Sequence, residues 1–322
     1  MNKKERVLAA INQRPVDCVP CGFSLHFPQE QWHGEAGVRA HLDFFRESDT
    51  DIIKIMNENH FPCFGAMVDA SSYSALCRGF SIESSFMQDQ LAFTKEILGR
   101  AEGDSFSVGT LHGITASAIH PLEQMGLSYA ESRERLAAYL RDNPHKMLSA
   151  LQRITDTLSE LAMKYIEAGL DGVFYAALGG ERRYFTDEEF HAWIEPFDKQ
   201  VMTAIREAGG YVVLHICKDG LNMERYASYP GFADVINWGV HTAPFTLEEG
   251  RRLFPGKTVM GGLPDRHGVL VDGSEEEIAS YVEGIISSYG RTGLIIGADC
   301  TLSTEQDMSK LSAAVRACRR GL

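Results

Sequence analysis

The sequence has no uninterrupted run of about 18 apolar residues, so no part of it is expected to span a membrane. Residues 1–15 are charged and then helical in pattern, and they lack the apolar centre and the small-residue cleavage site of a signal peptide. The sequence also lacks a basic cluster: 31 Lys and Arg residues stand against 44 Asp and Glu residues, and the formal net charge is −13. Because this negative field repels phosphate backbones, nucleic-acid binding is not expected.

Cysteines are scarce and show no framework spacing. The chain of 322 residues has seven of them, an odd number, at positions 18, 21, 63, 77, 217, 300 and 318. Disulfide-stapled secreted domains are short and pair their cysteines, whereas this chain is long enough to bury a core without staples. Reduced thiols in a cytoplasmic protein are therefore expected, and some of them could serve as metal ligands.

What the sequence does contain is a regular alternation of strand-like and helical segments. Each strand-like run has nearly continuous apolar character, which is typical of strands buried on both faces. The eight predicted strands are residues 16–24, 51–56, 106–113, 172–178, 211–217, 235–240, 258–263 and 293–300. The predicted helices are residues 4–12, 37–47, two within 132–168 that break at Asn143-Pro144, 187–208 after Thr186, 247–254, 275–288 after Ser274, and 305–319.

This alternation favours an α/β protein with a (β/α)8 TIM barrel over an open doubly wound sheet. No G-x-G-x-x-G motif opens a helix after an early strand, which argues against a dinucleotide-binding fold. We therefore predict a single barrel domain over residues 1–322. Residues 61–103 are irregular in composition and are expected to form an excursion over the barrel mouth.

The strongest chemical signal is the sequence LHIC, which places His215 and Cys217 two residues apart on a predicted strand. Alternation along a strand points both side chains to one face, about 7 Å apart. Cys300 ends the last predicted strand, and in a barrel the carboxyl ends of the strands carry the active site. One histidine and two cysteines suit Zn²⁺, and three protein ligands with an open fourth position are typical of catalytic zinc. A core role for these residues stays open as the alternative.

Three further residues are candidates for a catalytic pocket. Glu181 follows the fourth predicted strand, and it could be the resting fourth zinc ligand or a rim carboxylate paired with Arg182 or Arg183. His112 ends the third predicted strand and Tyr175 lies on the fourth. Both could line the pocket, and simple packing is the alternative for each.

Other polar residues carry weaker signals. Asn237 on the sixth predicted strand could orient a substrate or fill the core. Asp299 alternates to the face opposite Cys300, so it is expected to anchor a loop. Cys18 and Cys21 form a C-x-x-C pair, but within a strand they point to opposite faces, which predicts buried thiols.

Longer segments carry a family resemblance: ERVLAAINQRPVDCVPCG, YIEAGLDGVFYAALGG, GGYVVLHICKDG, KTVMGGLPDRHGVL and LIIGADCTLSTEQDMSKLSAAVRAC. Together they resemble the uroporphyrinogen decarboxylase superfamily over nearly the full length. The H-x-C pattern followed by a distant Cys resembles its zinc-dependent methyltransferase branch. That branch includes methylcobamide:coenzyme M methyltransferases and corrinoid-dependent O-demethylase methyltransferases.

The resemblance implies that His215, Cys217 and Cys300 bind zinc. It also implies transfer of a methyl group between a corrinoid and a small substrate, which is a methyl ether, a methanol- or methylamine-type donor, or a thiol acceptor. In that chemistry zinc is the Lewis acid and the corrinoid performs the difficult step. The chain lacks the D-x-H-x-x-G motif of the cobalamin-binding module, so the cobalamin is expected on a partner corrinoid protein.

Two departures from the family pattern bear on the substrate. Decarboxylases of the family carry an Arg-rich R-Q-A-G-R-Y segment that grips porphyrinogen carboxylates, and the corresponding GFSLHFPQEQW contains no Arg. Lys218 replaces the usual Gly after H-x-C, and residues 301–304 replace a Pro-rich turn. A uroporphyrinogen decarboxylase-like enzyme and a non-catalytic metal-binding barrel remain the alternatives to a methyltransferase.

Overall fold

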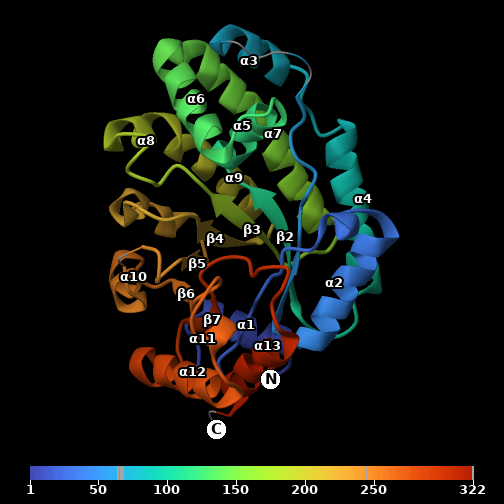
Figure 1. The fold of residues 1–322 in the computed structure, drawn as a ribbon, viewed down its shortest axis with the longest axis vertical. Helices are drawn as coiled ribbons and strands as arrows, with labels where there is room; N and C mark the ends of the chain where they lie inside the picture. The colour runs from blue at the N-terminus through green and yellow to red at the C-terminus, as the bar shows by residue number, and fades with distance from the viewer. Residues whose placement is uncertain (64, 66–68, 244, 321–322) are drawn as a thin grey trace.

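A parallel sheet curled into a partial barrel organises the chain (Figure 1). The computed structural model describes residues 1–63, 65, 69–243 and 245–320. Within these residues, seven strands lie side by side in chain order, and each pairs in parallel with the next. They are β1 (Ile52–Ile55), β2 (Phe106–His112), β3 (Gly172–Ala177), β4 (Tyr211–Ile216), β5 (Val235–Trp238), β6 (Thr258–Leu263) and β7 (Leu294–Ala298).

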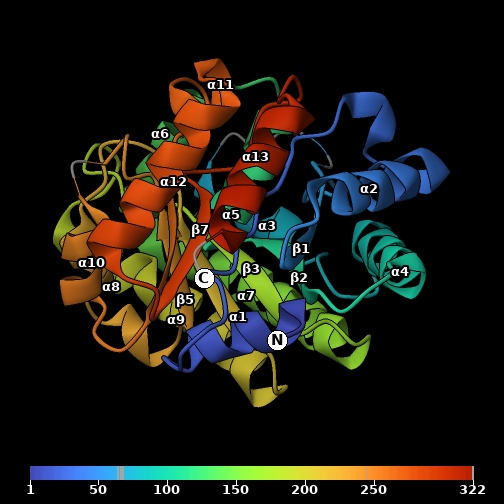
Figure 2. The same cartoon turned by 90° about the horizontal axis from the view of Figure 1, so that it is seen from below.

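Helices surround the sheet (Figure 2). The α-helices are α1 (Lys3–Ile11), α2 (Gly34–Ser48), α3 (Ala70–Cys77), α4 (Ser85–Arg100), α5 (Ile114–Gln124), α6 (Tyr129–Asp142), α7 (Pro144–Glu167), α8 (Asp187–Trp193), α9 (Glu195–Glu207), α10 (Leu247–Leu253), α11 (Val269–Asp272), α12 (Glu275–Tyr289) and α13 (Met308–Arg319). Short 3₁₀ turns are η1 (Gln29–Gln31), η2 (Met223–Tyr226) and η3 (Tyr229–Gly231). Strand–helix alternation is thus confirmed.

The prediction of eight regular strands is wrong at the first of them. Residues 16–24 form only isolated bridges, in which Cys21 pairs with Ile296 of β7 and Gly22 pairs with Ile52 of β1. Pro20 has no amide hydrogen, so it contributes only its carbonyl, which accepts from Ile296 at 2.9 Å. The segment therefore lies between the first and last strands without becoming a strand itself. The architecture is TIM-barrel-like, with seven regular strands among the described residues.

Several helix boundaries follow the sequence signals. Asn143 separates α6 from α7 and its side chain caps α7, while Thr186 and Ser274 cap α8 and α12 through capping boxes. Predicted helix 187–208 is divided into α8 and α9, because Pro196 near the start of α9 cannot continue the hydrogen-bonded ladder.

Residues 61–103 are more regular than their composition predicted. They contain α3 and α4; α3 packs on α7, and α4 packs on both α2 and α7. Residues 64 and 66–68 of this segment lie outside the described part of the chain. The single-domain assignment stays a prediction.

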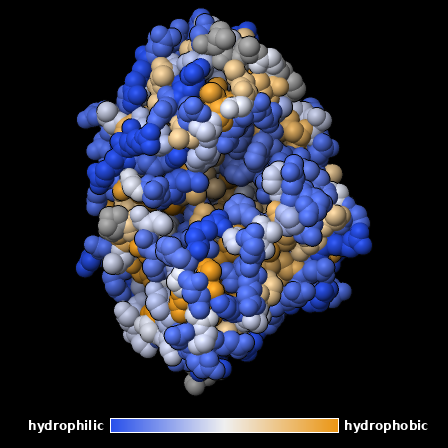
Figure 3. Space-filling model, viewed as in Figure 1, coloured by the Kyte–Doolittle hydropathy of each residue, from blue (hydrophilic) through white to orange (hydrophobic). Residues whose placement is uncertain are grey.

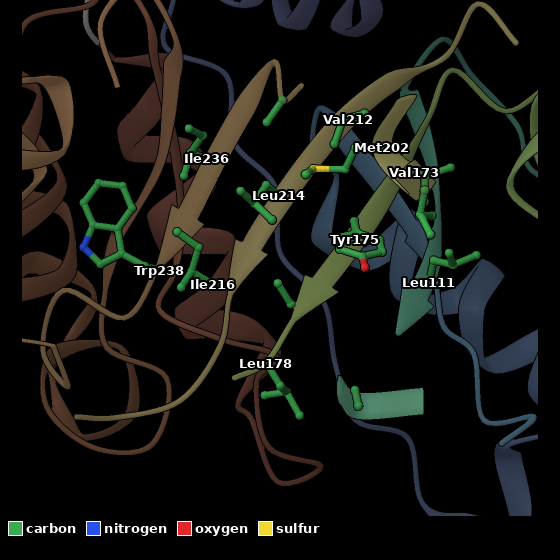
Figure 4. Close-up of a cluster of buried hydrophobic side chains, with 14 of the residues drawn as sticks. Leu111, Val173, Tyr175, Leu178, Met202, Val212, Leu214, Ile216, Ile236 and Trp238 are labelled. Atoms are coloured by element: carbon green, nitrogen blue, oxygen red, sulfur yellow. The ribbon is translucent and has the colours of Figure 1, made fainter. Parts of the chain in front are cut away.

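Alternation along the strands creates two apolar layers. One layer faces the interior of the partial barrel, where it packs with residues of α1 such as Val7. It contains Val108, Phe174, Val213 and Val235. The alternate residues face the helices, and Figure 4 shows this outer layer with Leu111, Val173, Tyr175, Val212, Leu214, Ile216, Ile236 and Trp238 from neighbouring strands and Met202 from α9. A side chain near the end of a strand therefore reaches the pocket only if it has the parity of the interior layer.

The face of the molecule seen in Figure 3 is mostly hydrophilic. Among the described residues, no helix has both the length and the apolar character needed to cross a bilayer.

Candidate metal centre

His215, Cys217 and Cys300 converge at the carboxyl ends of β4 and β7. Their possible ligand atoms all lie within 4.8 Å of one another. The Cys300 sulfur is 3.4 Å from His215 Nε2 and 3.9 Å from the Cys217 sulfur. Tetrahedral zinc with ordinary Zn–S and Zn–N bonds would separate these pairs by about 3.6 and 3.8 Å. The donor set and its spacing therefore fit a four-coordinate zinc ion with one further position.

Strand parity explains why these side chains meet. His215 has the same parity as Val213, which lies in the interior layer, and the register aligns it with Ala176 on β3 and Asn237 on β5. The ring of Phe174 stacks on the His215 imidazole, with 5.4 Å between centroids and 29° between planes. His215 itself is only 3% exposed, so its ring is held in a fixed place.

Asn237 sets the tautomer of His215. The Asn237 amide group donates to the carbonyls of Met260 at 3.0 Å and Ala298 at 3.1 Å, which leaves its oxygen as the acceptor for His215 Nδ1. His215 Nδ1 must therefore carry the hydrogen, and Nε2 presents its lone pair toward Cys300. The sequence suggested Asn237 only as a substrate-orienting or core residue, and the structure makes it the partner of a predicted ligand.

The two sulfurs influence one another. The hydrogen bond between them lowers the pKa of Cys300 well below its usual value and raises that of Cys217. A thiolate at Cys300 is the form that binds a metal ion.

A pocket of about 280 Å³ opens over these residues, and it is lined by side chains from both halves of the sheet. Lys54 of β1 lies in its wall, where the ammonium is 3.3 Å from the hydroxyls of both Ser24 and Thr301 and 3.8 Å from the centre of the Phe174 ring. Within the described chain this ammonium has no ion-pair partner within 4 Å. Burial lowers the pKa of Lys54 to about 8, so it retains a positive charge at neutral pH. Lys54 was not predictable from the sequence, because one lysine within an apolar strand gives no signal of its own.

His112 lines the same pocket, as predicted, and it has two companions. His60, from the loop after β1, and His120, from α5, lie beside it with their ring nitrogens within 4.8 Å of one another. Glu58 lies in the same wall, and burial raises its pKa to about 7. The sequence predicted His112 as a pocket residue but did not predict its grouping with His60 and His120.

Glu181 does not occupy the position of a fourth ligand. One carboxylate oxygen pairs with Arg133 of α6 and the other accepts from the Gly179 amide at 3.0 Å. Among the described residues, Glu181 neither lines the pocket nor belongs to the group of possible metal ligands formed by His215, Cys217 and Cys300. The predicted partners, Arg182 and Arg183, were also wrong, because Arg133 reaches Glu181 from a helix distant in sequence.

Tyr175 is wrong as a pocket residue. It is paired in register with Leu214, whose parity is opposite to that of His215, so it points toward the helices (Figure 4). Its hydroxyl donates to Asp198 of α9 at 2.5 Å and accepts from the Ile114 amide at 3.2 Å. Its role is therefore to join β3 to the surrounding helices.

The predictions for Asp299 and for Cys18 and Cys21 are confirmed. Asp299 anchors a loop, since its carboxylate accepts from the amides of Val240 at 3.1 Å and His241 at 2.9 Å. Cys18 and Cys21 are buried free thiols, as expected.

Comparison with known proteins agrees with this architecture. A model of the family "Uroporphyrinogen decarboxylase (URO-D)" matches residues 126–321. Among solved structures, a methyltransferase from Methanosarcina mazei is similar over 99% of both chains, with a TM-score of 0.76 and 16% identity. A B12-independent methionine synthase from a Shewanella species has a TM-score of 0.61 at 14% identity and covers 94% of this chain and 98% of its own. These similarities show a shared fold. Among curated protein sequences, none matches the chain significantly.

Proposed function

Since the chain belongs to the uroporphyrinogen decarboxylase family, we propose that it is a zinc-dependent methyltransferase that moves a methyl group between a small substrate and a corrinoid held by a partner protein. The observation that carries this proposal is the convergence of His215, Cys217 and Cys300 at the spacing of tetrahedral zinc ligands. Three protein ligands leave one position for a substrate atom, as in catalytic zinc sites.

A bound zinc ion would act as a Lewis acid that lowers the pKa of a thiol or polarises a methyl ether oxygen. The chain's own residues prepare the site for it. Asn237 holds His215 in the ligating tautomer, and Phe174 covers one face of the imidazole. The pocket above Cys217 and Cys300 has room for a small substrate.

Lys54 favours a substrate atom that carries negative charge. As thiolates, Cys217 and Cys300 would balance the charge of a zinc ion, so a thiolate or phenolate bound beside them would add a net negative charge that needs a compensating cation. The Lys54 ammonium lies in the same pocket with only hydroxyl groups and a ring beside it in the described structure. It can therefore donate a hydrogen bond to such an atom and stabilise its charge.

The pocket does not favour a porphyrinogen. Among the described residues that line it there is no arginine, and its volume of about 280 Å³ suits a much smaller ligand than a tetrapyrrole. A non-catalytic metal-binding barrel is disfavoured by the missing fourth side chain, because Glu181 is engaged with Arg133. Structural zinc sites are normally closed by four protein ligands.

A reducing compartment, the cytoplasm, suits this centre. The sulfurs of Cys217 and Cys300 are only 3.9 Å apart, and all seven cysteines are free thiols. Such a pair would be prone to oxidation to a disulfide outside a reducing environment.

The assay that tests this function uses methylcobalamin with a series of thiol acceptors, and cob(I)alamin with methyl ethers, while the cobalt–carbon chromophore is followed. We expect turnover of at least one pair by the zinc-loaded protein. Cys217→Ala should lower the rate by more than about a hundredfold, because a Lewis acid contributes several kcal/mol to the transition state.

Cys63→Ala is the matched control, since Cys63 is a free thiol outside the pocket lining. It should transfer methyl groups at the wild-type rate. Full activity in zinc-free Cys217→Ala would contradict the proposal, and turnover of a porphyrinogen would instead support the decarboxylase alternative.

A further inference from the structure

Three imidazoles form a second group in the wall of the pocket, on the side of β1 and β2. The ring of His112 meets those of His60 and His120 edge to face, with centroids 5.3 and 5.0 Å apart. The rings of His60 and His120 are stacked, with centroids 4.1 Å apart and planes 13° apart. Each imidazole offers a nitrogen within 4.8 Å of the others.

The ring nitrogens of this imidazole cluster have no hydrogen-bond partner among the residues that the structure describes. Within the described chain none of the three rings forms a hydrogen bond, and Nδ1 of His120 is completely buried without one. His120 is only 6% exposed. A buried polar atom without a hydrogen-bond partner is destabilising, so an arrangement with such an atom is unfavourable unless a ligand satisfies it.

The three rings are neutral at physiological pH. Burial lowers the pKa of His112 to about 3 and lowers those of His60 and His120 as well, and the neighbouring imidazoles add to the shift at His112 and His120. A neutral imidazole has a free lone pair on one nitrogen, which is the form that ligates metal ions.

We propose that His60, His112 and His120 bind a second divalent transition-metal ion, in the same pocket as the thiolate site but separate from it. Three imidazoles suit Zn²⁺ and its late first-row neighbours, whereas Mg²⁺ and Ca²⁺ prefer oxygen ligands. Glu58 places a carboxyl group beside the cluster, 3.8 Å from Nε2 of His60.

Binding requires one ring to turn. A metal ion must lie near the plane of each imidazole that ligates it, so two stacked rings cannot both bind the same ion. His120 is fixed in α5 and His112 at the end of β2, whereas the side chain of His60 is 37% exposed on a loop. His60 is therefore the ring that rotates, and its exposed side chain is the ligand by which an ion enters this site.

The test counts metal ions. Metal-free protein is saturated with zinc, passed through a desalting column, and analysed for zinc per chain. Wild type should hold two ions, Cys300→Ala one, His112→Gln one, and the double variant none. His26→Gln is the matched control, because His26 lines the pocket but is outside the cluster, and it should hold two.

Cobalt distinguishes the two sites by spectrum. Co²⁺ bound to thiolates absorbs strongly through sulfur-to-metal charge transfer, and Co²⁺ bound only to imidazoles does not. The charge-transfer band should vanish in Cys300→Ala and remain in His112→Gln. Because His120 is buried and its substitution could unfold α5, His60→Ala is the second variant. It should weaken the second ion more than about tenfold, since even outer-shell losses have effects of that size.

Saturation of wild type at one ion that is lost in Cys300→Ala would overturn this inference and leave the proposed function standing. Two ions in His112→Gln would overturn it as well. Retention of both ions in Cys300→Ala would instead count against the thiolate site on which the proposed function depends.

Discussion

The side-chain amide of Asn237 has hydrogen-bond partners at both its NH₂ group and its oxygen, and together they fix the orientation of His215. The NH₂ group donates to the carbonyls of Met260 and Ala298, and the oxygen accepts from His215. Replacing Asn237 with alanine should let the His215 ring rotate and should leave Nδ1 without a partner. We expect Asn237→Ala to weaken zinc binding about 10–100-fold, the size of effect typical of a lost outer-shell partner.

Competition with a chromophoric chelator measures that affinity. Asn237→Asp keeps an acceptor for His215 Nδ1 but lacks the donors to Met260 and Ala298, so it should recover part of the loss. Equal zinc affinity in wild type and Asn237→Ala would mean that the hydrogen bond does not orient the ligand.

Individual residues were predictable where a local pattern carried the information. His215 and Cys217 were found because alternation puts them on one face, and Cys300 because the carboxyl ends of parallel strands meet. Tyr175 was wrong because both faces of its strand are apolar, so its direction depends on register with β4. Glu181 was wrong because its partner, Arg133, lies 48 positions earlier in the chain.

At the scale of elements, a buried carboxylate joins β3, α9 and η3. Asp198 of α9 is fully buried, and it accepts from Tyr175 of β3 at 2.5 Å and from Tyr229 of η3 at 3.0 Å. Burial raises the pKa of Asp198 to about 7. The folded protein therefore holds the proton more tightly than the unfolded chain does.

This raised pKa makes stability depend on pH. The stabilisation from Asp198 is fully present below about pH 4, near the unfolded pKa, and is lost as pH rises through about 7. The free energy of unfolding of wild type should therefore fall, relative to that of Asp198→Asn, between pH 5 and pH 8. Urea unfolding of both proteins at the two pH values measures this difference. A difference that stays constant, or that changes in the opposite direction, would contradict the assignment.

Elements were predictable where they are long or carry caps. The break at Asn143 and the capping boxes of Thr186 and Ser274 are local signals, and they hold. Residues 16–24 resemble a strand in composition, but a strand also needs ladder hydrogen bonds from its neighbours. Only Cys21 and Gly22 form bridges with β7 and β1, and Pro20 has no hydrogen to donate.

At the scale of the whole molecule, the order of strands was predictable because parallel strands joined by helices lie next to one another in sequence order. The pocket was less predictable, since its wall combines residues from many elements. The three histidines of the imidazole cluster come from a loop, a strand end and a helix, and no spacing in the sequence relates His60 to His112 or His120. Lys54 was missed for the same reason, because its importance depends on what lies across the pocket.

The central claim is that His215, Cys217 and Cys300 form a zinc centre, and zinc X-ray absorption tests it most directly. Metal-free protein would be given one equivalent of zinc before measurement. We predict a shell of two sulfur atoms at about 2.3 Å with nitrogen or oxygen at about 2.0–2.1 Å, and fewer sulfur atoms around the zinc in Cys300→Ala. A zinc ion surrounded only by nitrogen and oxygen, or a protein that binds no zinc, would contradict the account.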